Sequence, residues 1–273
     1  MKILIAADME GITGVVSWNH VATDHPEYAR FRKLMTYDVN AAIRGAYEGG
    51  ASEVVVSDGH SYGRNILIEE LDPRARLNSG TPSPLSMVQG VDSAVSAVIF
   101  VGYHARIGTQ NAILEHTWSD ERVANLWING DLFGEIGLNA AVSGHFGVPV
   151  NMISGDHSAC SEAAGLLKEI ETAVVKRASS RMAAECLPPS VAQELIQAAA
   201  NRAVQGLKAG RAPQPLKLSP PITMTIDFVQ SEMADKAAFL PGATRAGRRL
   251  QYTAPDMVTL YAAFRTALAL ARG

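Results

Sequence analysis

The most constraining feature of the sequence is a short apolar run near the N-terminus that ends in two acidic residues. Ile3 to Ala7 contains no polar side chain, which predicts a β-strand buried on both faces. Asp8 and Glu10 follow directly, and Gly11 lets the backbone turn sharply after them. Two neighbouring carboxylates at the end of a buried strand cost free energy unless a cation lies between them. We therefore predict that a pair of metal ions binds at this strand end.

The segments that follow predict a parallel β-sheet covered by helices. Apolar residues recur at helical spacing from Tyr28 to Glu48, and the β-branched run from Glu53 to Ser57 predicts a second strand. A strand–helix–strand order of this kind is typical of parallel sheets in α/β proteins. Further strands are predicted at 97–101, 123–129, 148–153 and 172–175, and further helices at 134–142 and 159–168. The predicted fold class is α/β, with a mostly parallel sheet flanked by helices.

The character of the sequence changes beyond about residue 179. A long amphipathic helix is predicted at 191–207, and a proline-rich linker follows it. Residues 222–228 alternate between apolar and polar, as a half-exposed antiparallel strand does, and 250–253 is its predicted partner. A terminal helix is predicted at 256–271. We predict an α/β lobe at 1–178 and a smaller α+β C-terminal lobe at 179–273.

Composition narrows the possible classes of function. The chain has 273 residues, of which 47% are hydrophobic and 19% charged, with a net charge of -3, so no basic surface predicts binding to nucleic acid or an anionic membrane. Cys160 and Cys186 are the only cysteines, which argues against a disulfide framework and a thiolate metal site. The sequence contains neither a signal-peptide apolar core nor a membrane span, so a cytoplasmic location is the expectation.

Metal-capable side chains follow three of the predicted strands. Asp8 and Glu10 follow the first strand, His60 follows the second, and His104 follows the strand at 97–101. Because the carboxyl ends of parallel strands meet at one edge of a sheet, these side chains can converge. Glu135, at a glycine-flanked helix start, is a fourth candidate position. This mixed nitrogen and oxygen set suits zinc or manganese, and one bridging carboxylate would let it hold two ions.

Each of these residues also has an ordinary structural interpretation. A histidine after a strand is more often a surface or core residue, and Glu135 could simply be a favourable acid in a first helical turn. Asp58 could orient His60 through a hydrogen bond or cap the turn that follows it. His116 could be a catalytic acid, base or transition-state stabiliser, or a structural loop residue. The other histidines are interpreted as surface or capping residues: His20, His25, His145 and His157.

Four motifs together resemble the D-aminopeptidases of the DppA type, peptidase family M55. The similarity runs through most of the chain and is densest in the first ~155 residues. The motifs are Asp8-Met9-Glu10-Gly11, Asp58-Gly59-His60-Ser61, Gly102-Tyr103-His104-Ala105 and Gly134-Glu135-Ile136-Gly137-Leu138-Asn139. Three differences from the family pattern, at Ala6, at Glu115 and in the length of the 104–116 loop, concern the pocket more than the candidate ligands.

The resemblance implies a fold, an activity and a set of site residues. It implies a site for two Zn²⁺ ions, with Mn²⁺ or Co²⁺ as alternatives, and His116 as the catalytic residue. It also implies hydrolysis of the N-terminal residue of short D-amino-acid peptides such as D-Ala-D-Ala, and a homo-oligomer, including a decamer of two stacked pentameric rings. The implied metal ligands are Asp8, which bridges, and Glu10, His60, His104 and Glu135.

Two other functions fit parts of the sequence. Asp8-Met9-Glu10-Gly11 also resembles the first motif of haloacid-dehalogenase-type phosphatases, in which the first acid would be a phosphorylated nucleophile. That interpretation requires one Mg²⁺ and gives His60 and His104 no role. A cytoplasmic peptide-binding protein without enzymatic activity is the third possibility, and the number of convergent ligand residues argues against it.

Overall fold

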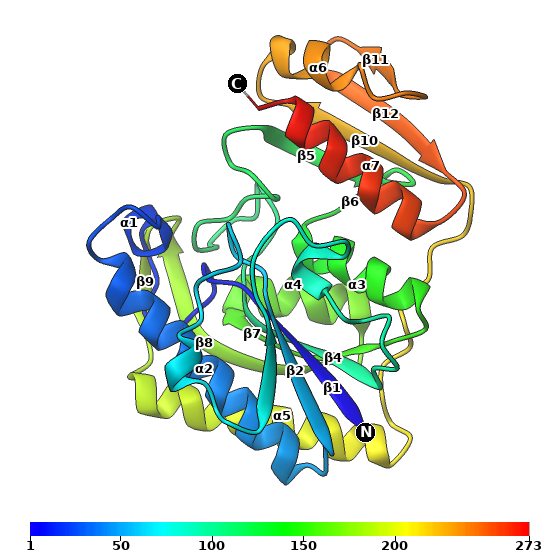
Figure 1. Ribbon diagram of the computed structural model, residues 1–273. Coiled ribbons are helices and arrows are strands. Elements are labelled where there is room, and N and C mark those ends of the chain that lie inside the picture. Colours follow the sequence, from blue (N-terminus) through cyan, green and yellow to red (C-terminus); the bar gives the residue numbers. More distant parts are fainter. Residues whose placement is uncertain (273) are drawn as a thin grey trace.

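The computed structural model describes residues 1–272, which form two β-sheets with helices around and between them (Figure 1). The larger sheet has seven strands in the order β3-β2-β1-β4-β7-β8-β9. All neighbouring pairs are parallel except β8 and β9. Its strands are β1 (Lys2–Ala7), β2 (Glu53–Asp58), β3 (Ala75–Asn78), β4 (Ala97–Tyr103), β7 (Val150–Asp156), β8 (Glu171–Ser180) and β9 (Ala183–Cys186).

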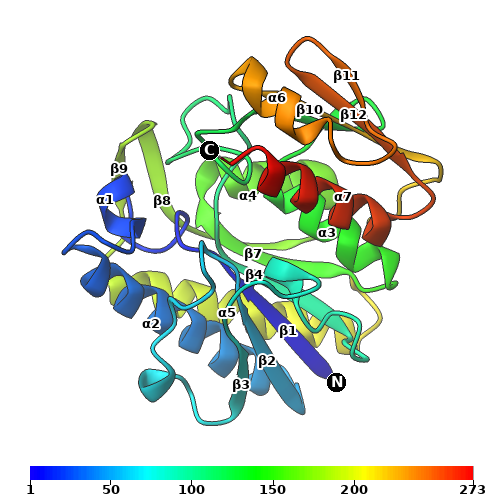
Figure 2. The ribbon, with the colours of Figure 1, turned by 45° about the horizontal axis from the view of Figure 1, so that its top comes forward.

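Helices cover both faces of this sheet (Figures 1 and 2). One face packs against α2 (Tyr28–Glu48) and α5 (Pro189–Lys208), and the other against α3 (Glu135–His145) and α4 (His157–Leu167). Successive residues of β1 point to opposite faces, so Ile3 and Ile5 join the first layer and Leu4 joins the second. Both faces are apolar because both are covered, which confirms the predicted α/β class.

The smaller sheet is antiparallel and has the strand order β11-β12-β10-β5-β6. Its strands are β5 (Val123–Ile128), β6 (Asp131–Leu132), β10 (Ile222–Phe228), β11 (Thr244–Ala246) and β12 (Arg249–Ala254). The helices α6 (Ser231–Ala237) and α7 (Met257–Leu270) pack against it. The predicted pairing of 222–228 with 250–253 is confirmed, with Met224 opposite Tyr252. This sheet and its helices form the smaller α+β lobe.

The predicted boundary at residues 178 and 179 does not coincide with the division between the two sheets. β9 and α5 lie beyond that boundary but belong to the larger sheet and its covering layer. β5 and β6 lie before it but pair into the smaller sheet, where Thr225 of β10 lies opposite Trp127. The chain therefore enters the smaller lobe, returns, and enters it again. Pairing between strands about 100 residues apart has no local signal in the sequence.

The two long C-terminal helices are buried within their own chain. α5 packs along α2, where Gly45 allows close approach because a Cβ there would collide with the main-chain oxygen of Gln197. α7 packs on α3, α6 and β12. Both helices thus use their alanine-rich faces inside one subunit, and they do not cover one another. Among residues 1–272, no helix has both the length and the hydropathy that crossing a membrane requires.

The carboxyl ends of β1, β2 and β4 lie side by side, because these strands are adjacent and parallel. Three short helices complete the fold: α1 (Trp18–Val21), η1 (Ile68–Glu70) and η2 (Ser86–Val88). α1 and η2 contribute residues to a cleft above these strand ends, and α7 of the smaller lobe contributes to the same cleft. The fold therefore brings three strand ends and both lobes to one site.

Candidate metal centre

The loop after β1 is held tightly against the end of β4. The main-chain nitrogen of Asp8 donates a 2.8 Å hydrogen bond to Val101, and that of Gly11 donates a 2.8 Å bond to Gly102. Gly11 is required here because a Cβ at this position would collide with the main-chain oxygen of Tyr103. The acids of the loop are therefore positioned by backbone contacts to the neighbouring strand.

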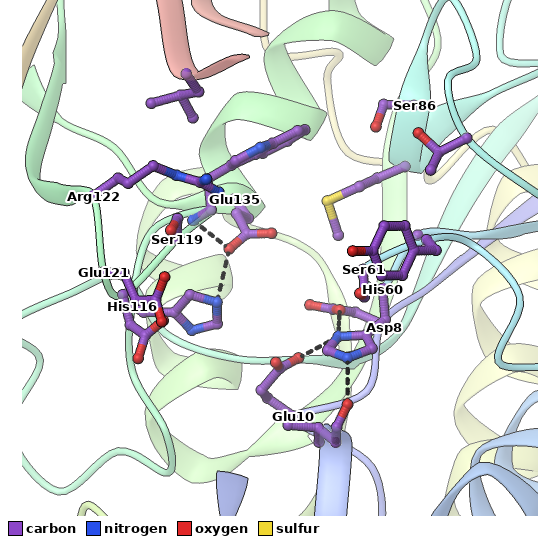
Figure 3. A pocket seen from close by; sticks show the side chains of 18 of the residues that line it. Asp8, Glu10, His60, Ser61, Ser86, His116, Ser119, Glu121, Arg122 and Glu135 are labelled. Carbon is purple, nitrogen blue, oxygen red and sulfur yellow. Dashed lines mark hydrogen bonds and ion pairs between the residues drawn. The ribbon is translucent and has the colours of Figure 1, made fainter. Parts of the chain in front are cut away.

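His60 follows β2 and points at the two acids that follow β1 (Figure 3). Its Nδ1 lies 3.6 Å from Asp8 Oδ1 and 3.2 Å from Glu10 Oε2. Its Nε2 lies 3.0 Å from the main-chain oxygen of Val21, which assigns the proton of the neutral ring to this nitrogen. The neutral ring therefore presents the lone pair of Nδ1 to the carboxylates, as a metal-binding histidine does.

His104 follows β4 and lies on the other side of Asp8. Its Nε2 lies 3.4 Å from Asp8 Oδ2 and 3.1 Å from Glu135 Oε1, and its Nδ1 lies 3.0 Å from the main-chain oxygen of Ala105. Asp8 thus directs one oxygen toward each histidine, an arrangement in which a carboxylate can bridge two ions. Five side chains thus form one group, which we call the metal-site cluster: Asp8, Glu10, His60, His104 and Glu135.

Buried atoms of the metal-site cluster lack hydrogen-bond partners. Within residues 1–272, Asp8 Oδ2, Glu10 Oε2 and His104 Nε2 are buried and accept or donate no hydrogen bond. Buried polar atoms in folded proteins are nearly always paired, because an unpaired one costs free energy. Imidazole nitrogens and carboxylate oxygens are ligands that Zn²⁺ prefers. The chemistry and burial of these side chains therefore fit a zinc centre.

Burial and mutual charge shift the pKa values within the metal-site cluster. Burial, and then the Glu10 carboxylate, raise the pKa of Asp8 to about 7. Burial lowers the pKa of His60, but the charges of Glu10 and Asp8 outweigh it and raise that pKa well above its usual range. The pKa of His104 is raised in the same way, since Glu135 and Asp8 outweigh its burial. Without a metal, the cluster thus retains protons that a bound cation would displace.

His116 lies beside the metal-site cluster but is held differently. Its ring stacks on that of His104 at 4.0 Å between centroids, and its Nε2 lies 3.7 Å from Glu135 Oε1. Its Nδ1 lies 2.9 Å from the main-chain oxygen of Leu114, which places the proton of the neutral ring on Nδ1. Burial, and then the neighbouring His104, lower the pKa of His116. His116 is thus a neutral imidazole at pH 7 whose unprotonated Nε2 faces the site.

The loop that carries His116 is fixed from two directions. The carboxylate of Asp156, at the end of β7, accepts a 2.6 Å hydrogen bond from the main-chain nitrogen of Ile113. Arg181, in the turn between β8 and β9, forms a 2.5 Å ion pair with Glu115, and its own main-chain oxygen accepts from Leu114. Glu115, which differs from the family pattern, therefore helps to hold this loop in place through its ion pair with Arg181.

A cleft of about 1120 Å³ opens above the metal-site cluster. Asp8, Glu10, His60, His116 and Glu135 line it, and Figure 3 shows these side chains directed toward one another across it. Its other walls combine aromatic, apolar and charged side chains, among them Trp18, Tyr62, Met87, Trp118, Arg122 and Leu268. The volume is large enough for a peptide of a few residues.

The predicted site residues all come together, and the ambiguity at Asp58 is resolved. The Asp58 carboxylate accepts hydrogen bonds from the main-chain nitrogens of Asn65 and Ile66, so it caps the following loop, and within residues 1–272 it forms no hydrogen bond with the His60 ring. Of the remaining histidines, His20 stacks on Phe31 at 3.7 Å. Among the described residues, none of His20, His25, His145 and His157 lines the cleft above the metal-site cluster.

The sequence interpretation missed Lys176, which is fully buried beneath the site. Its Nζ donates hydrogen bonds of 2.6, 2.8 and 2.7 Å to the main-chain oxygens of Glu10, Ile12 and Val15. Burial lowers its pKa to about 8. No local signal could have identified it, because Lys176 is followed directly by Arg177 and its acceptors lie in a distant part of the sequence.

Comparison with known proteins agrees with this geometry. The family model of the D-aminopeptidases, peptidase family M55, matches residues 1–266. A D-aminopeptidase of Bacillus subtilis (strain 168) is 36% identical over 267 residues, which cover 96% of this chain and 95% of the relative. A solved structure, the Zn-dependent D-aminopeptidase DppA from Bacillus subtilis, is described as a self-compartmentalizing protease. It superposes with a TM-score of 0.93 at 34% identity, over 99% of this chain and 98% of that one.

These matches favour the peptidase interpretation over the phosphatase alternative, which leaves His60 and His104 without a role. The family match spans both sheets and all of the metal-site cluster. The structural match has the same extent. The chain belongs to peptidase family M55, the D-aminopeptidases.

Proposed function

We propose that this protein is a zinc-dependent aminopeptidase that removes the N-terminal residue of short D-amino-acid peptides such as D-Ala-D-Ala. The observation that carries the proposal is the convergence of two histidines and three acids, three of whose buried atoms lack hydrogen-bond partners in residues 1–272. The metal-site cluster would hold two Zn²⁺ ions, with Asp8 between them. When bound, zinc supplies a water that ionises near neutral pH and polarises the substrate carbonyl.

His116 is the proposed catalytic residue. Its Nε2 is unprotonated and faces the cleft, while its Nδ1 is held by the main-chain oxygen of Leu114. This nitrogen accepts a proton from the water that adds to the substrate carbonyl carbon. It then gives the proton to the amide nitrogen as the carbon–nitrogen bond breaks and the amine leaves. The lowered pKa of His116 suits this role, because the ring is neutral before the reaction and regenerates readily after it.

The proposed exopeptidase selectivity rests on the free amino group of the substrate. That group is cationic, and three acids of the metal-site cluster line the cleft and can attract it: Asp8, Glu10 and Glu135. An acid or a metal can bind the amine, so the first peptide bond lies at the reactive position. Hydrolysis of internal bonds is disfavoured because they offer no free amine.

Metal analysis combined with a substrate panel tests the proposal. The purified protein is analysed for zinc per chain, treated with a chelator, and assayed on D- and L-alanyl dipeptides before and after Zn²⁺ is restored. We expect two zinc ions per chain, loss of hydrolysis on chelation, recovery with zinc, and preference for the D-peptide. Full activity in protein verified to be metal-free would exclude the proposal. A single Mg²⁺ with phosphatase activity would support the alternative enzyme, and peptide binding without hydrolysis would support the binding protein.

We further propose that the protein is a cytoplasmic homo-oligomer that encloses its active sites, in the form of two stacked pentameric rings. The support is the description of DppA, its structural relative, as self-compartmentalizing. Exposed apolar side chains such as Phe239 and Ile68, which are 82% and 69% exposed, are available for contacts between subunits. Analytical ultracentrifugation checks this, since a mass equal to one chain of 29.1 kDa would contradict it.

A further inference from the structure

One arginine in the cleft, Arg122, forms no ion pair within residues 1–272 and has a buried side-chain nitrogen without a hydrogen-bond partner. Arg122 directly precedes β5, and its main chain is fixed by hydrogen bonds to Ser119 and Val229. Its side chain lines the cleft, and Figure 3 shows it on the side away from Asp8 and Glu10. The guanidinium thus lies across the cleft from Asp8 and Glu10, and its sequence neighbours Asp120 and Glu121 line the same cleft.

Burial partly desolvates the guanidinium of Arg122 and lowers its pKa, and the charges of Glu121 and Asp120 offset this only in part. Its Nε is buried and has no hydrogen-bond partner in the described part of the chain. Asp120 and Glu121 are exposed, and no carboxylate of residues 1–272 forms an ion pair with Arg122 within 4.0 Å. A buried donor that lacks a partner costs free energy, and a planar guanidinium binds carboxylates through two parallel hydrogen bonds. The missing partner is therefore an anion, and a carboxylate matches its geometry.

Two further arginines line the same cleft and differ from Arg122. Arg265 donates hydrogen bonds of 2.7 and 2.8 Å to the main-chain oxygens of Ser83 and Pro84, so its guanidinium is used to hold that loop. Arg272, at the end of α7, lies close enough for its charge to add to burial in lowering the pKa of Arg122. Two like charges beside one cleft both favour an anion between them.

Building on the proposed function, we infer that Arg122 binds the terminal α-carboxylate of the short peptide substrate, and that Arg272 adds to the attraction. The amino group of the peptide would lie at Asp8 and Glu10, and the carboxylate would lie at Arg122. Only a peptide of matching length can satisfy both ends at once. Arg122 would thus select short peptides with a free C-terminus, whereas the metal-site cluster performs the same chemistry on any amide placed there.

Three substrates and four proteins test this inference. The substrates are D-Ala-D-Ala, D-Ala-D-Ala amide, which lacks the carboxylate, and D-Ala-D-Glu α-amide, which carries a carboxylate only on its side chain. The proteins, all loaded with zinc, are the wild type, Arg122→Met, Arg122→Lys and the control Arg211→Gln. Arg211 is exposed and does not line the cleft. Zinc content and hydrolysis of the amide verify that each variant is folded.

For the wild type, we expect kcat/KM to be about 10- to 100-fold lower for both amides than for D-Ala-D-Ala, as expected for loss of a charge-assisted hydrogen bond. Arg122→Met should lower kcat/KM for D-Ala-D-Ala by the same factor, mainly through KM, and leave the amides unchanged. Arg122→Lys should have a kcat/KM for D-Ala-D-Ala between those of the wild type and Arg122→Met, because it keeps the charge but loses the two parallel hydrogen bonds that a guanidinium can donate. Arg211→Gln should match the wild type on every substrate.

Several outcomes would overturn the inference, and they are distinguishable from failure of the proposed function. Equal cleavage of D-Ala-D-Ala and its amide by the wild type would exclude a carboxylate site. Equal loss on all substrates in Arg122→Met would make Arg122 a structural residue. Rescue by the side-chain carboxylate of D-Ala-D-Glu α-amide would exclude recognition of the α-carboxylate. Absence of hydrolysis of any substrate by the zinc-loaded wild type would overturn the proposed function and this inference with it.

Discussion

The metal-site cluster and the pair Lys176 and Asp156 are both composed of buried charges, but they differ in how the chain satisfies them. Lys176 donates to three main-chain oxygens, and the two oxygens of Asp156 accept from the main-chain nitrogens of Ala159 and Ile113. In the metal-site cluster, by contrast, Asp8, Glu10 and His104 each keep a buried atom without a hydrogen bond. The charges of Lys176 and Asp156 thus hold loops in place, whereas the metal-site cluster keeps open positions that a ligand can fill.

This difference distinguishes buried charges that stabilise the fold from buried charges that are available to bind a ligand. A buried charge whose hydrogen bonds are complete rigidifies the fold, as Lys176 does for the loop that carries Glu10. A buried charge with an open position is costly until something from outside fills it. The same type of substitution should therefore have opposite consequences for the stability of the metal-free protein in the two regions.

The largest expected effect is from Asp8→Asn. This change removes the carboxylate placed between the two histidines, so we expect zinc binding and hydrolysis to fall below detection. The metal-free variant should nevertheless melt at a higher temperature than the metal-free wild type at pH 8, because the buried charge, whose pKa is raised to about 7, is gone.

The matched control for Asp8→Asn is Asp156→Asn. It should retain zinc but melt at a lower temperature, since its amide group can accept only one of the two hydrogen bonds. Calorimetry with and without a chelator measures both variants. If metal-free Asp8→Asn melts at a lower temperature than the metal-free wild type, this contrast between the two regions is wrong.

His116→Ala tests whether His116 is itself a metal ligand or only lies beside the metal-site cluster. Because His116 lies 3.7 Å from Glu135 and is held through Leu114, we expect the variant to keep two zinc ions and lose about 10²- to 10⁴-fold in kcat. His104, His116 and Glu135 also have donor atoms within 4.8 Å of one another, so His116 could instead bind a metal. Elemental analysis decides, since loss of zinc together with activity would make His116 a ligand.

Lys176→Met tests the other side of the comparison. It leaves three buried main-chain oxygens without their donor, so we expect the free energy of unfolding to fall by about 3–5 kcal/mol. Lys217→Met, at an exposed position, should change it by less than about 0.5 kcal/mol. Urea denaturation of the two variants measures the difference. Equal stability of Lys176→Met and the wild type would show that these three hydrogen bonds contribute nothing.

The smallest expected effect concerns the number of protons that the protein releases when it binds zinc. The pKa of Asp8 is raised to about 7, and those of His60 and His104 are raised above their usual range, so all three retain protons near pH 6.5 without a metal. Zinc binds only the deprotonated groups, so binding at pH 6.5 should release about one proton or more, and fewer at pH 9. Calorimetric titration in buffers of different ionisation enthalpy measures this number. Zinc binding without proton release would contradict it.

The same shifts give the metal-free protein a defined pH dependence. Because the folded-state pKa values of His60 and His104 lie above their unfolded values, their stabilisation is complete below about pH 6.5 and is lost as the pH rises through the folded values. The raised pKa of Asp8 acts in the same direction at lower pH, since its contribution is lost between its ordinary pKa and about 7. Stability without metal should therefore fall above pH 6.5, where zinc affinity increases.

By itself, the sequence determined the candidate ligands and the strands β1, β2, β4, β5, β7, β8, β10 and β12, but it did not predict the short strands β6, β9 and β11. Asp8, His60 and His104 could be predicted because parallel strands end at one edge of a sheet, so residues that directly follow them must lie near one another. The helix from Tyr28 to Glu48 could be predicted to the residue, because its apolar periodicity is long and uninterrupted. These are local signals combined with one general rule of topology.

Only the tertiary structure decided the pairing of β5 with β10, the burial of Lys176 and the placement of Arg122 in the cleft. Each depends on segments that are distant in the sequence, such as the 161 to 166 residues that separate Lys176 from its acceptors. Nothing local distinguishes a lysine that meets three carbonyl oxygens from one that meets solvent, because its partners are backbone atoms that any residue type supplies. The candidate ligands were therefore predictable from their own chemistry, whereas Lys176 and Arg122 were identified only by what the fold places beside them.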